Sequence, residues 1–247
     1  MTFVIFVILN LIDIRTFNSL NLSMTIISSG GFLPVNNFDS LFQSDFSKVT
    51  LSILILSSYF SLFLIYNLVF FKSKNLSYFS EDLYLAIYLT IVIAISFVLF
   101  SYDNDFLNIL VSISSSVSNL GISFENIPSN LTLIFLILVI IGGSFFSTSS
   151  GLRLIKVLSL IKYSINNLLS HSKPNQIYMN KVSLLRSSTN KSDINKYFLT
   201  VLIFVISLFS ISILLTISGI DFENSFKLGI LTIMNTVNSQ MYGLADF

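Results

Sequence analysis

Long runs of apolar residues alternate with polar stretches along the 247 residues of this chain. Each run matches the length that a helix needs to cross a hydrocarbon core of roughly 30 Å. Four such runs occupy 49–71, 83–102, 131–161 (with a Gly- and Ser-rich interruption at 142–151) and 197–220. This pattern predicts a succession of membrane-spanning helices.

The opening apolar run, 2–12, is too short to span a membrane. A signal peptide would have a basic residue before the run and a small-residue cleavage site after it. Here the first basic residue is Arg15, beyond the run, and no such site follows. We therefore favour a helix that an incomplete chain cuts short over a signal peptide.

Composition supports a membrane protein and excludes several other classes. Hydrophobic residues make up 53% of the chain and charged residues 10%, and the mean hydropathy is +0.84. A soluble domain carries about a quarter charged residues. Without cysteine and with one histidine, the chain holds no disulfide, thiolate site or multi-His metal cluster. The net charge of +1 gives no reason to expect nucleic acid, and no nucleophile–base pair or phosphate loop indicates an enzyme.

The charges between the runs predict how the chain is oriented. Segments 72–82 and 162–196 hold two and six of the basic residues, which the positive-inside rule assigns to the cytoplasm. Segments 13–47, 103–130 and 221–247 are acidic and are expected outside. The assignment alternates consistently with the four spans.

Each acidic connection contains the same succession of residues. An Asp at the membrane edge precedes a moderately apolar stretch of helical length, which leads into a Ser/Thr/Asn cluster beside glycine. The predicted short helices are 18–27, 107–117 and 227–237. The distance is 14 residues from Phe17 to Gly31, 15 from Phe106 to Gly121 and 15 from Phe226 to Met241. Near-equal spacing indicates one supersecondary unit used repeatedly.

Such a unit suits an ion pathway. An apolar stretch of about 10–12 residues fits a re-entrant helix, and irregular backbone at membrane depth is tolerated where it lines a water-filled path. Glycine permits the backbone angles that aim carbonyl oxygens at an ion, and helix C-termini favour a cation. The alternative is that these segments are surface loops with ordinary turn residues.

The same residues resemble the TrkH/KtrB potassium transporter subunits, a family related to the plant HKT transporters. Segment 23–32, SMTIISSGGF, resembles a pore loop of the form AMTTVSTGGF. Segment 142–156 resembles the family stretch GG-x-x-GSTGGGIKVIR, and 217–222, ISGIDF, resembles LTGLDF. Segment 169–175 resembles the cytoplasmic LIHPNA.

The resemblance implies an all-α integral membrane fold of repeated helix–re-entrant pore loop–helix units around a pore. It divides the chain into a second pore repeat with a truncated first helix (1–72), a cytoplasmic linker (73–82), a third repeat (83–170) with an intramembrane loop (142–151), a second linker (171–196) and a fourth repeat without its last helix (197–247).

The resemblance also implies the site residues. The filter backbone would comprise Ser29, Gly30, Gly31, Asn119, Leu120, Gly121, Ser239, Gln240 and Met241. Met241 stands where the family has a glycine, which departs from normal filter geometry. The gating loop would comprise Gly142, Gly143, Ser147, Thr148, Gly151, Arg153 and Lys156. Arg153 and Lys156 either face a cavity or extend to the cytoplasmic interface.

The implied function is potassium uptake by channel-like cation permeation, in a multi-pass protein of a bacterial inner membrane. K⁺ is the transported ion, with no other cofactor and no transition metal. The resemblance implies a homodimer and a cytosolic nucleotide-binding regulatory subunit. Two alternatives stay open: a permease subunit of another transporter class, whose broken helices also place Gly and Ser at mid-membrane, and a non-conducting membrane assembly protein.

Overall fold

The computed structural model describes residues 1–34, 38–61, 80–100, 106–124, 131–144, 146–172, 191–237 and 240–244. Its described elements are almost all helical, with one pair of two-residue strands. In chain order they are α1 (Thr2–Leu11), α2 (Thr16–Ser28), η1 (Asp39–Leu41), α3 (Asp45–Tyr59), α5 (Ser80–Phe100), α6 (Phe106–Val117), α7 (Thr132–Ile140), β1 (Ile141–Gly142), β2 (Leu152–Arg153), α8 (Leu154–Ser172), α9 (Lys191–Ile217), α10 (Phe222–Ile233) and η4 (Gln240–Tyr242). The prediction of an all-α membrane fold is confirmed.

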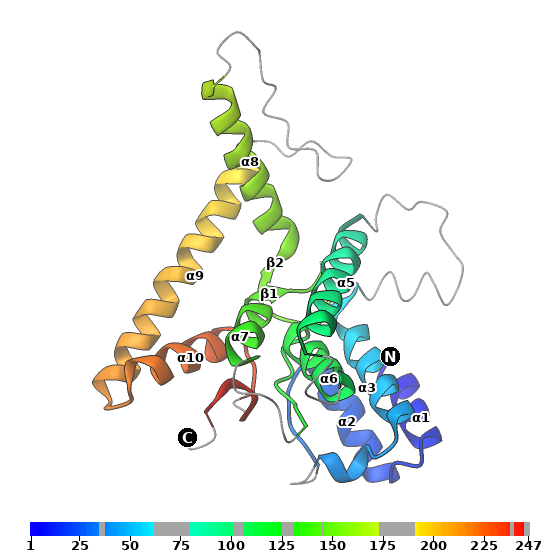
Figure 1. Ribbon diagram of the computed structural model, residues 1–247. Coiled ribbons are helices and arrows are strands. Elements are labelled where there is room, and N and C mark those ends of the chain that lie inside the picture. The colour runs from blue at the N-terminus through cyan, green and yellow to red at the C-terminus, as the bar shows by residue number, and fades with distance from the viewer. Residues whose placement is uncertain are drawn as a thin grey trace.

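A helix followed by a short helix occurs three times, as α1–α2, α5–α6 and α9–α10 (Figure 1). The chain reverses between α1 and α2 at Asp13, with φ of 63°, and between α9 and α10 at Gly219, with φ of 99°. In Figure 1, α1 to α3 lie on the right, α9 and α10 on the left, and α6 and α7 between them. The short helices α2, α6 and α10 therefore approach the middle of the molecule from different sides.

Helix α6 is the centre of the packing. Its residues Ile109, Ile113 and Val117 belong to a hydrophobic cluster with α7 and α10. Val111, on the opposite side of α6, belongs to a second cluster with α1, α2 and α3. Five serines of α6 and its C-terminal turn are buried. Four of their hydroxyls donate to the carbonyl four residues earlier, those of Ser112, Ser114, Ser116 and Ser118. The hydroxyl of Ser115 accepts from the Ile122 N–H. A helix that is buried on all sides can carry these serines because each hydroxyl has a partner.

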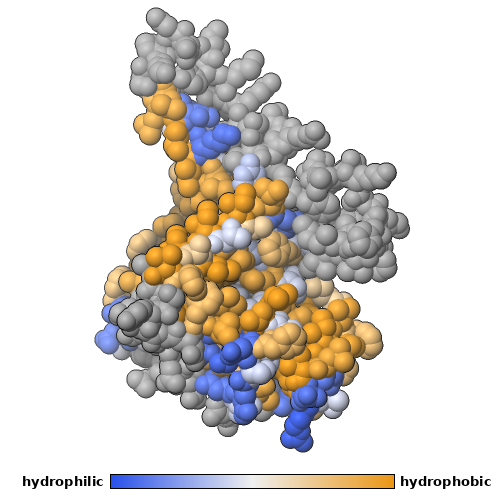
Figure 2. Space-filling view, turned by 45° about the vertical axis from the view of Figure 1, so that its right-hand side comes forward, coloured by the Kyte–Doolittle hydropathy of each residue, from blue (hydrophilic) through white to orange (hydrophobic). Residues whose placement is uncertain are grey.

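Two described helices are long and apolar enough to span a membrane, and both leave most of that surface outside the core. The spans are Glu81–Val98 in α5, 22% buried, and Asp193–Ile217 in α9, 11% buried. A core helix of a soluble protein would be mostly buried, whereas these helices expose isoleucine, leucine and phenylalanine side chains. Figure 2 shows apolar residues over most of the described surface on that face, with hydrophilic residues at its lower end and in smaller groups near the top. The chain is a membrane protein.

The predicted helices and the observed ones differ in two informative places. The sequence predicts one helix over 49–71, but α3 ends at Tyr59 and Phe60 is extended. The carbonyls of Ser58 and Tyr59 accept hydrogen bonds from the 142–151 segment, and residues 62–79 lie outside the described part. The other difference is the position of the third short helix, which is predicted over 227–237 and begins at Phe222 in the structure.

Candidate functional site

The three short helices end in the same turn. At the C-terminus of each, a main-chain N–H donates to the carbonyl five residues earlier: Gly30 to Thr25 at 3.1 Å, Leu120 to Ser115 at 2.9 Å and Thr236 to Leu231 at 2.9 Å. This six-to-one hydrogen bond is the Schellman motif, which requires a left-handed residue just before the donor. That residue is Ser29 with φ of 50°, Asn119 with 63° and Asn235 with 52°.

The shared turn defines a register for the repeat. Residue 29 follows residue 16 by 13 positions, residue 119 follows residue 106 by 13, and residue 235 follows residue 222 by 13, where 16, 106 and 222 begin α2, α6 and α10. We call 29–31 the first segment, 119–121 the second segment and 235–237 the third segment. Their last residues, Gly31, Gly121 and Val237, occupy equivalent positions.

These three segments meet. A Cβ added to Gly31 would overlap the Leu120 carbonyl oxygen and the Val237 side chain, and one added to Gly121 would lie 2.5 Å from the Val237 carbonyl oxygen. Gly31 and Gly121 also have positive φ, 65° and 75°, which favours glycine. The structure thus brings together the two segments that hold six of the predicted filter residues: Ser29, Gly30, Gly31, Asn119, Leu120 and Gly121.

A hydroxyl stabilises each of the first two segments from within. The Thr25 hydroxyl donates to the Phe32 carbonyl at 2.8 Å, and the Ser115 hydroxyl accepts from the Ile122 N–H at 2.7 Å. Thr25 and Ser115 are equivalent positions, and so are Phe32 and Ile122. The equivalent residue of α10 is Leu231, which has no hydroxyl.

Met241 lies outside the three segments, in η4. In the register of the shared turn, Val237 and not Met241 is equivalent to Gly31 and Gly121. The sequence spacing took Phe226 as the start of the third helix, but Phe222 begins α10, one turn earlier on the same helix face. Gln240 and Met241 lie in η4, which packs against α7, and Ser239 is outside the described residues. Met241 is 2% exposed, with its sulfur 3.8 Å from the Ser116 hydroxyl.

The Gly- and Ser-rich interruption is an irregular loop closed by the parallel pairing of β1 with β2. Ile141 pairs with Leu152 and Gly142 with Arg153. Close packing explains its glycines: a Cβ would overlap the Ser150 carbonyl at Gly142 and the Tyr59 carbonyl at Gly143, while Gly151 has φ of 106°. The loop predicted from the sequence is therefore present, between α7 and α8.

This loop is hydrogen-bonded to α3, to the second segment and to the C-terminal end of α10. Ser144 and Thr148 donate main-chain N–H groups to the carbonyls of Tyr59 and Ser58, at 3.2 Å each. At the other end, the Ser150 hydroxyl accepts from the Asn119 side chain at 2.7 Å and donates to the Met234 carbonyl. The sequence does not predict this link, because nothing in the loop distinguishes Ser150 from its neighbours.

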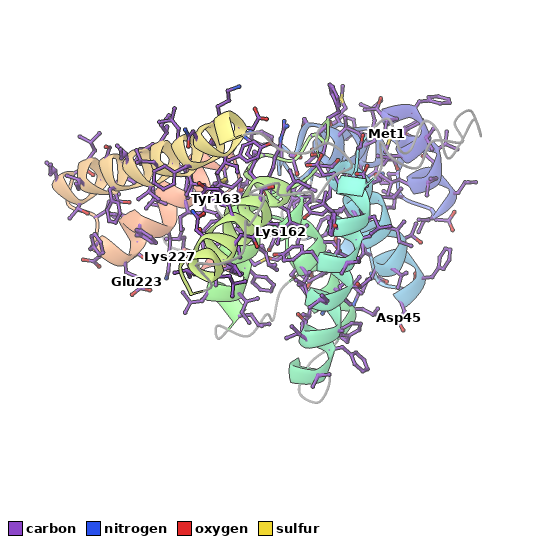
Figure 3. The ribbon with its side chains drawn as sticks, turned by 90° about the horizontal axis from the view of Figure 1, so that it is seen from above. Met1, Asp45, Lys162, Tyr163, Glu223 and Lys227 are labelled. Atoms are coloured by element: carbon purple, nitrogen blue, oxygen red, sulfur yellow. The ribbon has the colours of Figure 1, made fainter. Side chains whose placement is uncertain are left out.

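The remaining predicted loop residues lie within the loop, in β2 or in α8. Ser147 donates its hydroxyl to the Ser144 carbonyl at 2.8 Å, inside the loop. Arg153 is in β2 and Lys156 in the first turn of α8, and both are half-buried. Farther along the same helix, Lys162 and Tyr163 appear in Figure 3. No group of three or more His, Cys, Asp or Glu residues that could hold a metal occurs in the described ranges.

Comparisons with known proteins agree with this geometry at the level of fold. The chain is similar to the crystal structure of the potassium transporter TrkH from Vibrio parahaemolyticus, with a TM-score of 0.79 over 95% of this chain at 18% identity. The chain spans about half the length of that protein, since the match covers 52% of it. Neither a protein-family profile nor a curated protein sequence matches the chain. The likeness establishes that the two proteins share a fold, as the resemblance predicted.

Proposed function

We propose that this chain forms part of a potassium uptake pathway in a bacterial inner membrane, with main-chain oxygens of the first, second and third segments lining the narrowest part. The observation that carries the proposal is the meeting of three short helices that all end in the same turn. Each C-terminus presents partial negative charge, so three of them pointing together favour a cation. The fold shared with a potassium transporter supports K⁺ as that cation.

The third segment enters the proposal in the register of the structure. The filter contribution of α10 is then Asn235, Thr236 and Val237, in place of Ser239, Gln240 and Met241. Main-chain oxygens of one segment lie against the glycine of another here: the Val237 carbonyl approaches Gly121, and the Leu120 carbonyl approaches Gly31. A dehydrated cation requires such a set of carbonyl oxygens.

The 142–151 loop would gate the pathway. It is hydrogen-bonded to the second segment through Ser150 and Asn119, so movement of the loop would alter the inner end of the filter. The described main-chain hydrogen bonds from the loop to other elements go to α3, and opening would also break the side-chain bonds of Ser150 to Asn119 and to Met234. We extend the proposal to a channel-like transporter instead of an enzyme, assembled as a homodimer with a cytosolic nucleotide-binding subunit.

Glycine-to-aspartate variants test the proposal. In cells that lack their own potassium uptake systems, the reading frame containing this sequence should restore growth at low K⁺ and uptake of radiolabelled Rb⁺. Gly31→Asp and Gly121→Asp should abolish both, because the new side chain would overlap main-chain oxygens of adjacent segments.

The matched control is Gly219→Asp. Gly219 also has positive φ, but no atom lies within 4 Å of an added Cβ, so uptake should persist. Membrane content of each variant is measured by immunoblot. Undiminished uptake by both Gly31→Asp and Gly121→Asp would reject the pathway and favour an assembly role.

A further inference from the structure

The side chain of Asn119 is held in one orientation by the gating loop and by α10. It is fully buried, and its Nδ2 donates to the Ser150 hydroxyl at 2.7 Å and to the Met234 carbonyl at 3.2 Å. A flipped amide would place Oδ1 against the Met234 carbonyl, where two acceptors would repel one another. The hydrogen-bond partners therefore fix Nδ2 on the side of the loop.

The other end of this amide has no partner among the described residues. Asn119 Oδ1 is buried without a hydrogen bond, and so is the hydroxyl of Ser29, the equivalent residue of the first segment. A buried oxygen without a donor costs about 1–3 kcal/mol unless something else satisfies it. The two atoms occupy equivalent positions, each at the C-terminus of a short helix, where the partial negative charge favours a ligand with positive charge.

The chemistry of these atoms selects the class of ligand. An amide oxygen and a hydroxyl are neutral oxygen donors, whereas Mg²⁺ and Ca²⁺ sites in proteins use carboxylates. Asn119 and Ser29 carry no charge, and no carboxylate cluster occurs in the described ranges. A monovalent cation that retains some of its water fits two neutral oxygens.

We propose that Asn119 Oδ1 and Ser29 Oγ are side-chain ligands for the permeating monovalent cation where the first and second segments begin, and that Ser150 is a positioning residue that orients the Asn119 amide. This rests on the proposed function and adds side-chain ligands to its main-chain filter. It also couples the loop to the ion: when Ser150 withdraws, Asn119 loses one of its two acceptors and Oδ1 is no longer held toward the cation.

Cation binding by the purified chain tests the proposal. Potassium chloride is titrated against choline chloride at constant ionic strength, and thermal unfolding in detergent is followed by circular dichroism, because the chain has no tryptophan. A cation that binds only the folded state raises the unfolding temperature with its concentration. Asn119→Leu should weaken the apparent K⁺ affinity by roughly tenfold, as expected for losing one desolvated ligand.

The Ser150 variants separate positioning from simple packing. Ser150→Ala should weaken K⁺ affinity by about threefold, a fraction of the effect of losing the ligand itself, while Ser150→Thr, which keeps the hydroxyl, should restore it. The matched controls lose the same groups elsewhere: Ser210→Ala in α9, whose hydroxyl donates to Ile206, and Asn10→Leu in α1, whose amide donates to Phe6. These two controls can lower the unfolding temperature in the absence of K⁺. The rise of the unfolding temperature with K⁺ concentration should be the same in them as in the wild type.

The outcomes are distinguishable. Unchanged K⁺ affinity in Asn119→Leu would overturn the inference and assign Oδ1 to water, while the proposed function would stand if Gly31→Asp and Gly121→Asp still abolish uptake. Equal loss in Ser150→Ala and Ser150→Thr would overturn the positioning role. A wild-type chain that responds equally to potassium and choline would overturn the side-chain site itself.

Discussion

The first and second segments differ from the third in the residues that come after their shared turn. Gly31 and Gly121 continue with positive φ, while Val237 does not. A hydroxyl from the preceding helix is bonded across each of the first two segments, whereas Leu231 provides none on the third. One backbone turn can thus end three helices although the side chains around it differ.

The difference teaches how the segments fit together. Val237 brings bulk to the place where the segments meet, and Gly31 provides the space, since an added Cβ there would lie 2.7 Å from the Val237 Cβ. The Val237 side chain therefore fills the space where the third segment meets the first. The conformations of the first and second segments depend instead on their glycines and on the hydroxyl hydrogen bonds of Thr25 and Ser115. Substitutions at these positions test that distinction.

The largest effect is expected for Gly121→Ala. A non-glycine residue in left-handed geometry costs roughly 1–2 kcal/mol, and overpacking against the Val237 carbonyl adds about 1–3 kcal/mol. Gly219→Ala carries only the first cost, because its added Cβ meets nothing within 4 Å. The free energy of unfolding in detergent micelles should fall further for Gly121→Ala. Equal losses would show that the segments do not press together.

Removal of the hydroxyl bonds should have the next largest effect. Ser115→Ala leaves the N–H of Ile122, which is 3% exposed, without its acceptor, at a cost of about 1–3 kcal/mol. Thr25→Val removes the matching bond to Phe32 in the first segment. The control is Thr50→Val, whose hydroxyl bond to Phe46 is exposed on α3. A loss from Ser115→Ala no greater than from Thr50→Val would contradict the role assigned to these hydroxyls.

A double-mutant cycle examines the pair across the meeting point. Gly31→Ala should be partly rescued by Val237→Gly, with a coupling on the order of 1 kcal/mol, as expected of residues in contact. Rescue is incomplete because the Leu120 carbonyl also opposes the new Cβ. Gly121→Ala should gain nothing from Val237→Gly, since its closest neighbour is the Val237 main chain. Denaturant titration of the four variants measures both couplings, and equal rescue of the two alanine variants would show that the Val237 side chain is not what limits Gly31.

The sequence alone predicted much of this arrangement and missed its third part. Spacing and glycine located the first two segments, because positive φ two residues after the turn calls for glycine. Val237 is not a glycine, so this signal is missing from the third segment. Phe222 and Phe226 lie four residues apart on α10, and counting the repeat from Phe226 instead of Phe222 shifted the expected third segment by one helical turn. The end of α3 at Tyr59 was also hidden, because it depends on carbonyls that bond to a loop more than 80 residues later.

The smallest effect concerns the start of α10, which alone among the three short helices has an acidic residue in its first turn. Lys227 Nζ lies 2.7 Å from Glu223 on the next turn, and Figure 3 shows the pair on that helix. This hydrogen bond, with the charge of Lys227, holds the pKa of Glu223 below its usual value. The stabilisation is therefore present at neutral pH and is lost as the pH falls through the lowered pKa.

Glu223 is largely exposed, so Glu223→Gln should lower the unfolding temperature only slightly at pH 7 and not at all in acid, where the wild type has lost the same charge. Asp193→Asn, which alters the longer pair with Lys196 at 3.6 Å, is the matched control in α9. A difference between Glu223→Gln and the wild type that grows on acidification would show that the acid stabilises α10 in some other way.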